Sequence, residues 1–401
     1  MKGDQMSDVL RIGMVGCGGI AGAHVRGYKA LWDNQMREFE IAATCDIEKA
    51  KAEKMAADIA TWQGRKPNAY GSLEEFLAKE KGVQAVDICS LHRNHHTLAI
   101  PCMEAGKHVT IEKPLAITMR PARMMLDAAK KTRRILHVAE NYRRTPQNRA
   151  IHWTLRQGRI GAPRMIYWID VSERLWYWTW REHRDQAGGG WTLDGGVHFA
   201  DLFRYHIGEV KEIFSSVRTF FPTRYKKPQT FEEPVKVDVE DMTMSVLTFE
   251  NGVTGQWTST TAAPGQGFSK RVIYGEEGSL DLSAGLKTRK QELKVDELVY
   301  EFMNSIPKEE KDRLFPRGVT DSIATELKEF MDAVLHGRPM ETSGADQYKS
   351  LAVCFGVYES AATNQPVRIR DIEDLKIEEY QRDLNEGLGL RKAGKKSKAH
   401  K

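Results

Sequence analysis

The sequence lacks any apolar run long enough to cross a membrane, and it contains few cysteines. A membrane helix needs roughly 18 consecutive apolar residues, and no segment reaches that length. The amino end also lacks the succession of charged, apolar and small residues that marks a secretory leader. The five cysteines are scattered and form no CxxC pair; they are Cys17, Cys45, Cys89, Cys102 and Cys354. We therefore expect a cytoplasmic protein with reduced thiols, and neither a membrane protein nor a disulfide-stabilised secreted one.

The positive charge of the chain is concentrated at its carboxyl end. The formal net charge is +5, but residues 391–401 hold six Lys or Arg and no acidic residue. The rest of the chain is close to neutral and has no basic stripe, which argues against a nucleic-acid partner. We predict that residues 386–401 form a solvated, disordered tail. With 41% apolar and 29% charged residues, the remainder has the balance of a globular protein of two domains.

The first part of the chain alternates short β-branched segments with amphipathic helical ones. At this spacing the alternation predicts an α/β domain over residues 1–141, with a doubly wound parallel sheet of the Rossmann type. The predicted strands are 9–15, 39–44, 85–91, 108–112 and 135–139, and the predicted helices are 19–30, 48–59, 97–105 and 120–131.

The pattern changes after residue 141. Strand-like segments follow one another with few helices between them, and Asn251-Gly252 separates two alternating runs, a strong hairpin signal. We predict a second, α+β domain over residues 142–385 with an antiparallel or mixed sheet. Its expected strands are 165–171, 213–221, 242–249, 253–260 and 271–274, and its late helices, 322–335 and 345–360, are expected to pack on a sheet.

The first segment that carries chemistry is Gly16-Cys17-Gly18-Gly19-Ile20-Ala21, which follows a predicted strand and opens a predicted helix. Gly16 permits a tight turn, and Gly18 lets the backbone approach a pyrophosphate. The start of the helix offers free N–H groups and the positive end of a dipole to phosphates. Gly16, Gly18, Gly19 and Ile20 are therefore predicted to contact a dinucleotide.

Asp46, at the end of the second predicted strand, supports the same prediction. Its carboxylate can accept hydrogen bonds from an adenosine ribose. Asp46 and the nearby Glu48 would repel a 2′-phosphate, which favours NAD over NADP. The alternative role for Asp46 is a helix N-cap, and one carboxylate can serve both purposes.

Glu112-Lys113-Pro114 stands at the carboxyl end of a predicted strand, the edge at which ligands bind in open α/β sheets. A partly desolvated lysine there can donate a hydrogen bond to a reacting alcohol and assist proton transfer. The alternative is a surface ion pair.

Asp194 and His198 lie four residues apart in a glycine-rich segment that begins at Gly188. If the segment is helical, the two side chains share one face. Histidine exchanges protons near neutral pH, and a carboxylate can orient its ring. The alternative is an ordinary helix-surface pair.

Together these motifs resemble those of the Gfo/Idh/MocA family, the group of glucose–fructose oxidoreductase, inositol dehydrogenase and rhizopine-catabolism proteins. The resemblance runs from the glycine turn through Ala105-Gly106-Lys107-His108-Val109 and Glu112-Lys113-Pro114 to residues 188–198. It reaches the late stretch 326–339, with its Phe-x-x-Ala-x-x-x-Gly-x-Pro pattern. It implies a Rossmann domain followed by an α+β domain whose large, mostly antiparallel open sheet mediates dimers or tetramers.

The resemblance also implies roles for individual residues. Lys113 matches the catalytic lysine that hydrogen-bonds the reacting hydroxyl, and His198 matches the general acid/base. Asp194 would orient the substrate or His198. Glu112 would face the nicotinamide ribose, and the bond between Lys113 and Pro114 is a candidate cis peptide.

Other positions match the family less closely. Asn141 and Arg143 match positions that touch cofactor or substrate, and His96 matches a histidine at a helix start. Where the family has Thr-Pro-Asn or Thr-Pro-Pro, this chain has Leu91-His92-Arg93. We predict cofactor contacts at Leu91, His92, His96 and Asn141, and a substrate contact at Arg143.

A metal site is not expected, although His92, His95 and His96 are clustered in the sequence. No cysteine or carboxylate joins these histidines at the spacing that metal ligands require.

Aromatic residues are unusually dense before the Asp194 segment; they are Trp168, Trp176, Tyr177, Trp178, Trp180 and Trp191. Aromatic faces can stack on sugar rings while neighbouring charged side chains bind hydroxyls. We predict substrate contacts at Trp176, Trp178, Arg181 and Trp191, for a substrate larger than a free monosaccharide. Burial in an interface between subunits is the alternative.

We therefore predict an NAD(P)-dependent dehydrogenase that transfers a hydride between nicotinamide and a secondary hydroxyl of a sugar, polyol or glycoside. The enzymatic alternative is a redox-neutral, glycoside-cleaving enzyme with tightly bound NAD. The alternative of another class is a non-catalytic NAD-sensing regulator, which would not need Lys113, Asp194 and His198. We expect a homo-oligomer.

Overall fold

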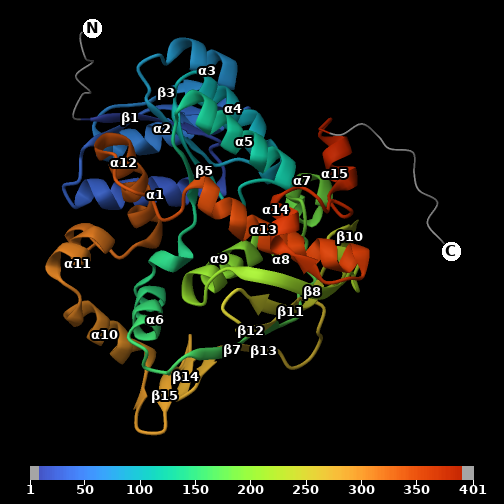
Figure 1. The fold of residues 1–401 in the computed structure, drawn as a ribbon. Helices are drawn as coiled ribbons and strands as arrows, with labels where there is room; N and C mark the ends of the chain where they lie inside the picture. The colour runs from blue at the N-terminus through green and yellow to red at the C-terminus, as the bar shows by residue number, and fades with distance from the viewer. Residues whose placement is uncertain (1–8, 391–401) are drawn as a thin grey trace.

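The computed structural model describes residues 9–390. The first part is a six-stranded parallel sheet in the order β3-β2-β1-β4-β5-β6, with helices on both faces (Figure 1). The strands are β1 Leu10–Val15, β2 Phe39–Cys45, β3 Asn68–Tyr70, β4 Ala85–Ile88, β5 His108–Glu112 and β6 Leu136–Ala139. The helices are α1 Gly19–Asp33, α2 Lys49–Gln63, α3 Leu73–Lys79, α4 His95–Glu104 and α5 Met119–Thr132. The predicted parallel, doubly wound sheet is confirmed.

Two local predictions differ from the structure. The strand predicted over residues 85–91 ends at Ile88, because the chain leaves the sheet there and turns into the short 3-10 helix η1, His92–Asn94. Strand β3 and helix α3 were not predicted. A strand of three residues is too short to display a period of two.

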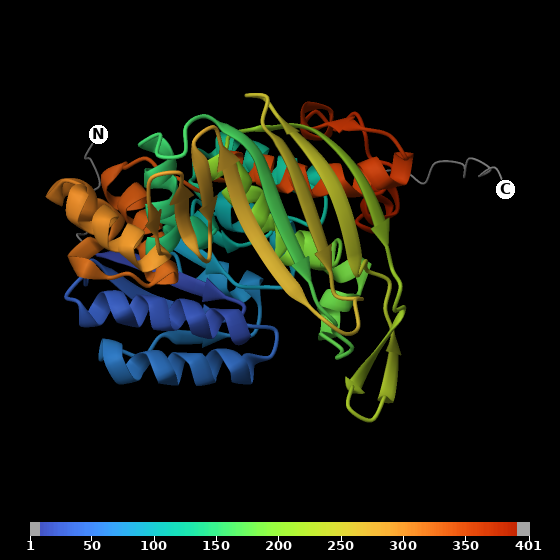
Figure 2. The same ribbon diagram turned by 90° about the horizontal axis from the view of Figure 1, so that it is seen from below.

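The second part is a nine-stranded sheet in the order β16-β15-β14-β13-β7-β12-β11-β8-β17. Strands β7 and β12 pair in parallel and the other neighbours are antiparallel, so the predicted mixed, mostly antiparallel sheet is confirmed. Strands β9 and β10 form a separate hairpin that projects from one end of the sheet (Figure 2). The strands are β7 Pro163–Val171, β8 Val210–Arg218, β9 Thr223–Lys227, β10 Glu232–Lys236, β11 Met242–Phe249, β12 Thr254–Thr260, β13 Phe268–Gly275, β14 Gly278–Asp281, β15 Gly285–Thr288, β16 Glu292–Leu293 and β17 Val367–Arg368.

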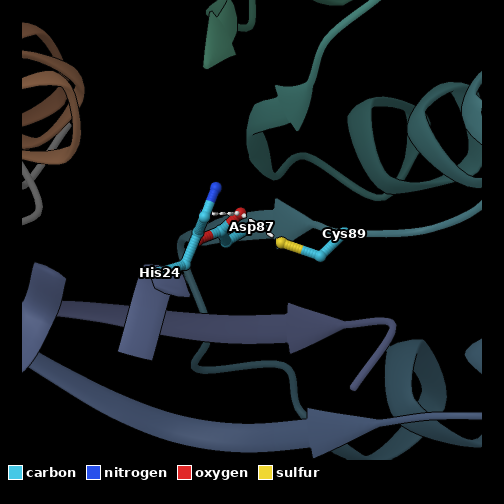
Figure 3. A group of neighbouring side chains, drawn as sticks. All are labelled: His24, Asp87 and Cys89. Atoms are coloured by element: carbon cyan, nitrogen blue, oxygen red, sulfur yellow. Dashed lines mark hydrogen bonds and ion pairs between the residues drawn. The ribbon is translucent and has the colours of Figure 1, made fainter. Parts of the chain in front are cut away.

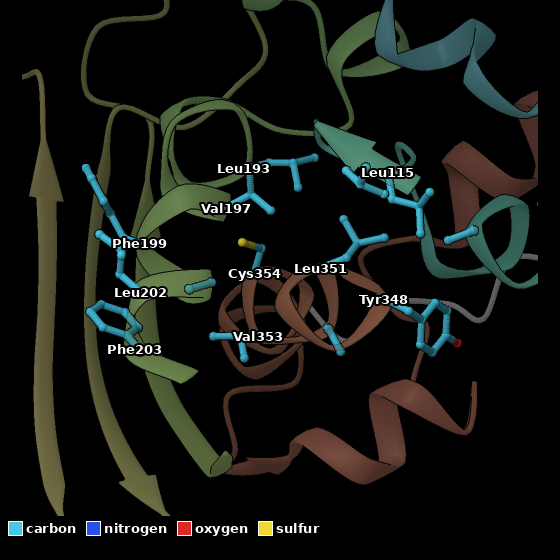
Figure 4. Close-up of a cluster of buried hydrophobic side chains, with 14 of the residues drawn as sticks. Leu115, Leu193, Val197, Phe199, Leu202, Phe203, Tyr348, Leu351, Val353 and Cys354 are labelled. Atoms are coloured by element: carbon cyan, nitrogen blue, oxygen red, sulfur yellow. The ribbon is translucent and has the colours of Figure 1, made fainter. Parts of the chain in front are cut away.

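Helices cover one face of this sheet and leave the other open, as Figures 1 and 2 show. The covering helices are chiefly α9 Gly196–His206 and α13 Gly344–Thr363. Phe199 and Phe203 of α9 pack on Trp168 of β7, and Phe203 also meets Trp257 of β12. Figure 4 shows the apolar side chains of α9 and α13 meeting above the sheet. This core supports the segment that carries Asp194 and His198.

The remaining helices connect these layers. They are α6 Pro146–Arg156, α7 Arg184–Ala187, α8 Trp191–Asp194, α10 Val295–Ser305, α11 Lys308–Leu314, α12 Ser322–His336, α14 Ile369–Glu373 and α15 Arg382–Gly387.

Helix α12 packs on the parallel sheet of the first part and also on its helix α1. Phe330 of α12 stacks on His137 of β6, as expected for a helix that covers a sheet, and the larger contact of α12 is with α1, which was not predicted. Leu327 and Phe330 of α12 share a buried cluster with Tyr28 and Leu31 of α1. Gly27 permits this close approach, because a Cβ there would lie 3.0 Å from a methyl of Ile323. Amphipathic spacing predicts a buried face but not the element that buries it.

The carboxyl end also departs from the predicted boundary at residue 385. Helix α15 continues to Gly387, and Arg93 of η1 donates a hydrogen bond to the Gly387 carbonyl. Asn385 is buried and accepts a hydrogen bond from Thr118, which fixes this end against the first part. The rest of the predicted tail, 391–401, lies outside the described residues, and the division into domains at residues 141 and 385 stays a prediction. No helix within residues 9–390 is both long and apolar enough to cross a membrane.

Candidate active site

The glycine turn between β1 and α1 has the geometry of a phosphate-binding loop. Gly16 has φ of +87°, and a Cβ there would lie 2.3 Å from the carbonyl oxygen of Cys89, so only glycine fits. A Cβ on Gly18 or Gly19 would meet nothing within 4 Å. Gly18 caps α1 without any side-chain hydrogen bond. The first N–H groups of α1 thus face open space of the kind a pyrophosphate needs.

A cavity of about 460 Å³ extends from this turn along the carboxyl edge of the parallel sheet. Among the predicted cofactor contacts, its walls include Gly16, Gly18, Gly19, Ile20, Asp46, Leu91, His92, Glu112 and Lys113. Trp180 and Arg181 of the second part also line it. The predicted contacts His96 and Asn141 are not part of this wall. His96 is buried within α4, and Asn141 precedes the short helix η2, Tyr142–Arg144.

Asp46 is fixed by two backbone groups and lies in the cavity wall. Its Oδ2 accepts a hydrogen bond from the Cys17 N–H at 2.8 Å, and its Oδ1 accepts one from the Glu48 N–H at 2.8 Å. Glu48, not Asp46, is the N-cap of α2. The carboxylate therefore braces the glycine turn while facing the space where a ribose would lie.

Glu112 forms a hydrogen bond with a fully buried histidine, His24, which was not predicted from the sequence. His24 of α1 contacts Glu112 Oε1 through Nε2 at 2.9 Å and Asp87 Oδ2 through Nδ1 at 2.9 Å (Figure 3 shows the contact with Asp87). Burial disfavours a charged His24, but the adjacent Asp87 carboxylate outweighs it and raises the pKa of His24 well above its ordinary value. The side chain is thus an imidazolium between two carboxylates.

His24, Asp87 and Cys89 lie close enough together to hold a metal ion. Both ring nitrogens of His24 carry protons that carboxylates accept, and a metal ligand needs a free lone pair. Burial also raises the pKa of the Cys89 thiol, which keeps the sulfur protonated. The chemistry of these donors does not suit a metal.

Lys113 joins the first part to the Asp194 segment. Its Nζ donates a hydrogen bond to the Asp194 carbonyl oxygen at 2.8 Å and lies 3.7 Å from Asp194 Oδ1. His92 Nε2 and Arg181 Nε approach the same oxygen at 3.3 and 3.2 Å. Burial alone would raise the pKa of Asp194, but Lys113, then His92 and Arg181, hold it well below its usual range. Two cations of the cavity wall, Lys113 and Arg181, therefore converge with His92 on one buried, ionised carboxylate.

His198 is not paired with Asp194 as the four-residue spacing suggested. Asp194 ends helix α8 and has Lys113, His92 and Arg181 as its partners, and His198 lies in helix α9, which starts at Gly196. His198 Nδ1 instead lies 2.8 Å from both carboxylate oxygens of Glu140, and the ring stacks on Tyr142 with centroids 3.9 Å apart. Glu140 was missed, although its place just after the last parallel strand is a signal for a ligand-facing residue.

The tryptophan-rich segment reaches the cavity at one end. Trp180 and Arg181 line the cavity, while the predicted contacts Trp176, Trp178 and Trp191 lie beyond its wall. The Arg181 guanidinium carbon stands 4.4 Å from the ring centroid of Trp180 and 4.8 Å from that of Trp178. These side chains thus form one cluster that starts at the cavity.

Arg143, predicted to touch substrate, is used elsewhere. Its guanidinium is buried and pairs with Asp201 and Asp346, away from the cavity wall. An arginine so committed to two carboxylates is a structural element that ties η2 to helices α9 and α13.

Comparison with known proteins agrees with this geometry. A family model described as an oxidoreductase family with an NAD-binding Rossmann fold matches residues 10–140. A second model, described as the GFO/IDH/MocA C-terminal domain, matches residues 149–281. The chain belongs to the Gfo/Idh/MocA oxidoreductase family. The family predicted from the motifs is confirmed, and so is NAD as the cofactor.

Relatives with named activities match between 74% and 90% of the chain. Levoglucosan dehydrogenase of Pseudarthrobacter phenanthrenivorans is 27% identical over 395 residues, which is 90% of this chain and 99% of the relative. The 1,5-anhydro-D-fructose reductase of Ensifer adhaerens is 30% identical over 74% of this chain and 83% of its own. A solved structure of levoglucosan dehydrogenase with NADH and levoglucosan matches with a TM-score of 0.71 at 25% identity, over 90% of this chain and 99% of that one.

Proposed function

We propose that the protein transfers a hydride between NAD and a secondary hydroxyl of a sugar, polyol or glycoside. The observation that carries the proposal is the contact of Lys113, in the wall of the dinucleotide cavity, with Asp194, together with His198, which follows Asp194 by four residues and is paired with Glu140. The relatives named as levoglucosan dehydrogenase, 1,5-anhydro-D-fructose reductase and myo-inositol 2-dehydrogenase support the substrate class.

The protein residues would divide the work around the reacting hydroxyl. Lys113 Nζ uses one proton on the Asp194 carbonyl and keeps others to donate to the substrate oxygen. His198 presents Nε2, which has no partner among residues 9–390, and would take the hydroxyl proton. Glu140, on the opposite nitrogen, stabilises the imidazolium that forms. Asp194 holds Lys113, His92 and Arg181 in place.

The cavity residues fit NAD. Gly16, Gly18, Gly19 and Ile20 would surround the pyrophosphate, Asp46 would bind the adenosine ribose, and Glu112 and Lys113 would flank the nicotinamide end. When bound, NAD supplies the hydride acceptor, and the protein supplies position and proton transfer.

The test is to follow reduced nicotinamide by absorbance with NAD or NADP over a panel of sugars, polyols and glycosides. We expect turnover with NAD that is lost in Lys113→Ala and His198→Ala. If no panel member produces NADH, although the protein binds NAD in a calorimeter, the dehydrogenase proposal is wrong.

We also propose that the open face of the nine-stranded sheet mediates self-association. Large apolar side chains on that sheet are exposed; they are Met165, Tyr167, Phe214, Met244, Val246, Phe268 and Tyr274. Monomeric proteins rarely leave so many apolar side chains on one face. Light scattering should give the mass of a dimer or tetramer, which Val246→Glu shifts toward the monomer.

We place the protein in the cytoplasm, because its five cysteines are all buried and free. Cell fractionation of the producing organism tests this, and recovery outside the cytoplasm contradicts it.

A further inference from the structure

An alternating row of arginines and tryptophans leads away from the cavity. The Arg181 guanidinium lies between the rings of Trp180 and Trp178, within 4.8 Å of each centroid. The Arg174 guanidinium stands 5.3 Å from Trp178 and 5.1 Å from Trp176. Only the inner end, Trp180 and Arg181, lines the cavity, and Trp176 at the outer end is 44% exposed. We refer to residues 174, 176, 178, 180 and 181 as the ladder.

The ladder is held rigidly from both sides. Arg174 pairs at 2.5 Å with Glu182, which is fully buried. The backbone around Trp176 pairs with Tyr225 of β9, where the Tyr177 N–H donates to the Tyr225 carbonyl at 2.9 Å. An aromatic surface whose rotamers are already fixed loses little entropy when a ligand lies on it.

The ladder also has hydrogen-bond donors left over. Arg181 uses only Nε, on Asp194, and Arg174 uses only Nη1, on Glu182; their other nitrogens have no acceptor within residues 9–390. Each of these donors lies beside an indole ring. A flat apolar ring would cover the indoles and leave the donors unmatched, whereas a sugar ring offers an apolar face and hydroxyl acceptors together.

From this arrangement we propose that the ladder is a second sugar subsite, so that the preferred substrate is a glycoside with a further pyranose attached to the ring that is oxidised. The proposal rests on the proposed dehydrogenase function. The ring that reacts lies beside Lys113, and the attached ring lies on the exposed indole of Trp176 with its hydroxyls toward Arg174. Trp178, between the two guanidinium groups, holds both arginines in position.

The test compares one-ring and two-ring probes of the same configuration. Methyl β-D-glucopyranoside, methyl β-cellobioside and phenyl β-D-glucopyranoside are assayed for NADH formation, and their binding to the NADH-loaded protein is measured by calorimetry. We expect kcat/KM for the two-ring sugar to exceed that for the one-ring sugar by about tenfold, the scale of one stacking contact. Trp176→Ala should bring this ratio close to one, and Trp176→Phe should restore part of it.

The control is Trp62→Phe, a tryptophan of α2 that packs on Trp32 and should leave the ratio unchanged. A wild-type ratio near one, an equal loss for both sugars in Trp176→Ala, or a preference for the phenyl glucoside over the cellobioside overturns the subsite. If no probe is oxidised, the dehydrogenase function fails for these sugars, and calorimetry still decides the subsite. Tighter binding of the cellobioside that Trp176→Ala removes supports it, and absence of that difference overturns it.

Discussion

Glu112 and Asp194 stand on either side of Lys113, and the chain surrounds the two carboxylates differently. Glu112 meets one cation, His24, which belongs to the same α/β part and is fully buried. Asp194 is approached by Lys113 and His92 from the α/β part and by Arg181 from the second part. Glu112 lies in the cavity wall and has its cation behind it in the buried interior, whereas Asp194 is neutralised by Lys113 from one part of the chain and Arg181 from the other.

The difference separates stability from chemistry. Charges buried without solvent must be matched, so removal of one partner from the Glu112 region leaves an uncompensated ion. The Asp194 carboxylate is itself buried, but Lys113, His92 and Arg181 around it line the cavity, and Lys113 and Arg181 carry more protons than one carboxylate can accept, which leaves protons for a substrate. Four experiments test this difference between the two carboxylates.

The largest effect is expected from His24→Gln. It leaves Asp87 and Glu112 buried without their shared cation, which should cost about 4 kcal/mol in the free energy of unfolding. Denaturant titration measures it. His336→Gln is the matched control, because His336 is half exposed and its contact with Asp332 is 3.9 Å. Equal stability of the two variants would mean that the Glu112 region is not held by charge.

Lys113→Ala should reduce activity and leave stability unchanged, the opposite of what is expected for His24→Gln. We expect kcat/KM to fall at least about 100-fold, the usual scale for a lost proton-transfer group, while the unfolding midpoint stays near that of the wild type. Initial rates of NADH formation and a thermal melt measure the two quantities. The exposed Lys290→Ala serves as control. Unfolding of the variant, or an unchanged rate, would remove Lys113 from the proposed chemistry.

Asp194→Asn keeps the shape of the side chain and removes its charge. The cations Lys113 and Arg181 would then face one another without a counter-ion and lose their common orientation. We expect kcat/KM to fall about tenfold, with Asp170→Asn, on the sheet beside Arg271, as the matched control. A rate equal to that of the wild type would show that the backbone carbonyl alone positions Lys113.

The smallest effect concerns the pH dependence of stability. The pKa of His24 is raised in the folded protein above its ordinary value of 6.5, so the folded chain keeps a proton that the unfolded chain has lost. The stabilisation is complete below pH 6.5 and is lost as the pH rises through the folded pKa, by up to about 1.4 kcal/mol per pH unit. Denaturant titrations between pH 6 and 9 should show this slope in the wild type and its absence in His24→Gln. Parallel curves would contradict an imidazolium at His24.

The features that could be predicted from the sequence are those set by local segments and by the order of strands and helices. The glycine turn, Asp46 and Lys113 each stand at the end of a strand, and the ends of parallel strands meet at one edge, so their convergence on one cavity follows from the order of the elements. The mixed sheet was predicted from the clustering of its strands. The roles assigned to the individual site residues stay predictions until they are tested.

The features that were missed depend on contacts between distant parts of the chain. Nothing near His24 in the sequence indicates Asp87 or Glu112, and nothing near His198 indicates Glu140. The spacing of Asp194 and His198 was misleading, because Asp194 has Lys113, His92 and Arg181 as partners and His198 has Glu140. Arg143 has the sequence position of a ligand contact, but Asp201 and Asp346 take its guanidinium.

The return of α12 to α1 has a consequence for synthesis of the chain. Tyr28 and Leu31 belong to the first tenth of the sequence. Helix α12, whose Leu327 and Phe330 cover them, is the last helix of that cluster to be translated. While the ribosome makes the intervening segment, the apolar surface around Tyr28 and Leu31 of the nascent dinucleotide-binding part stays exposed to water. An exposed apolar surface of this kind binds chaperones or aggregates. Residues 1–141 produced alone should therefore be poorly soluble, and the cofactor-binding part cannot be transplanted as a module unless a segment equivalent to α12 accompanies it.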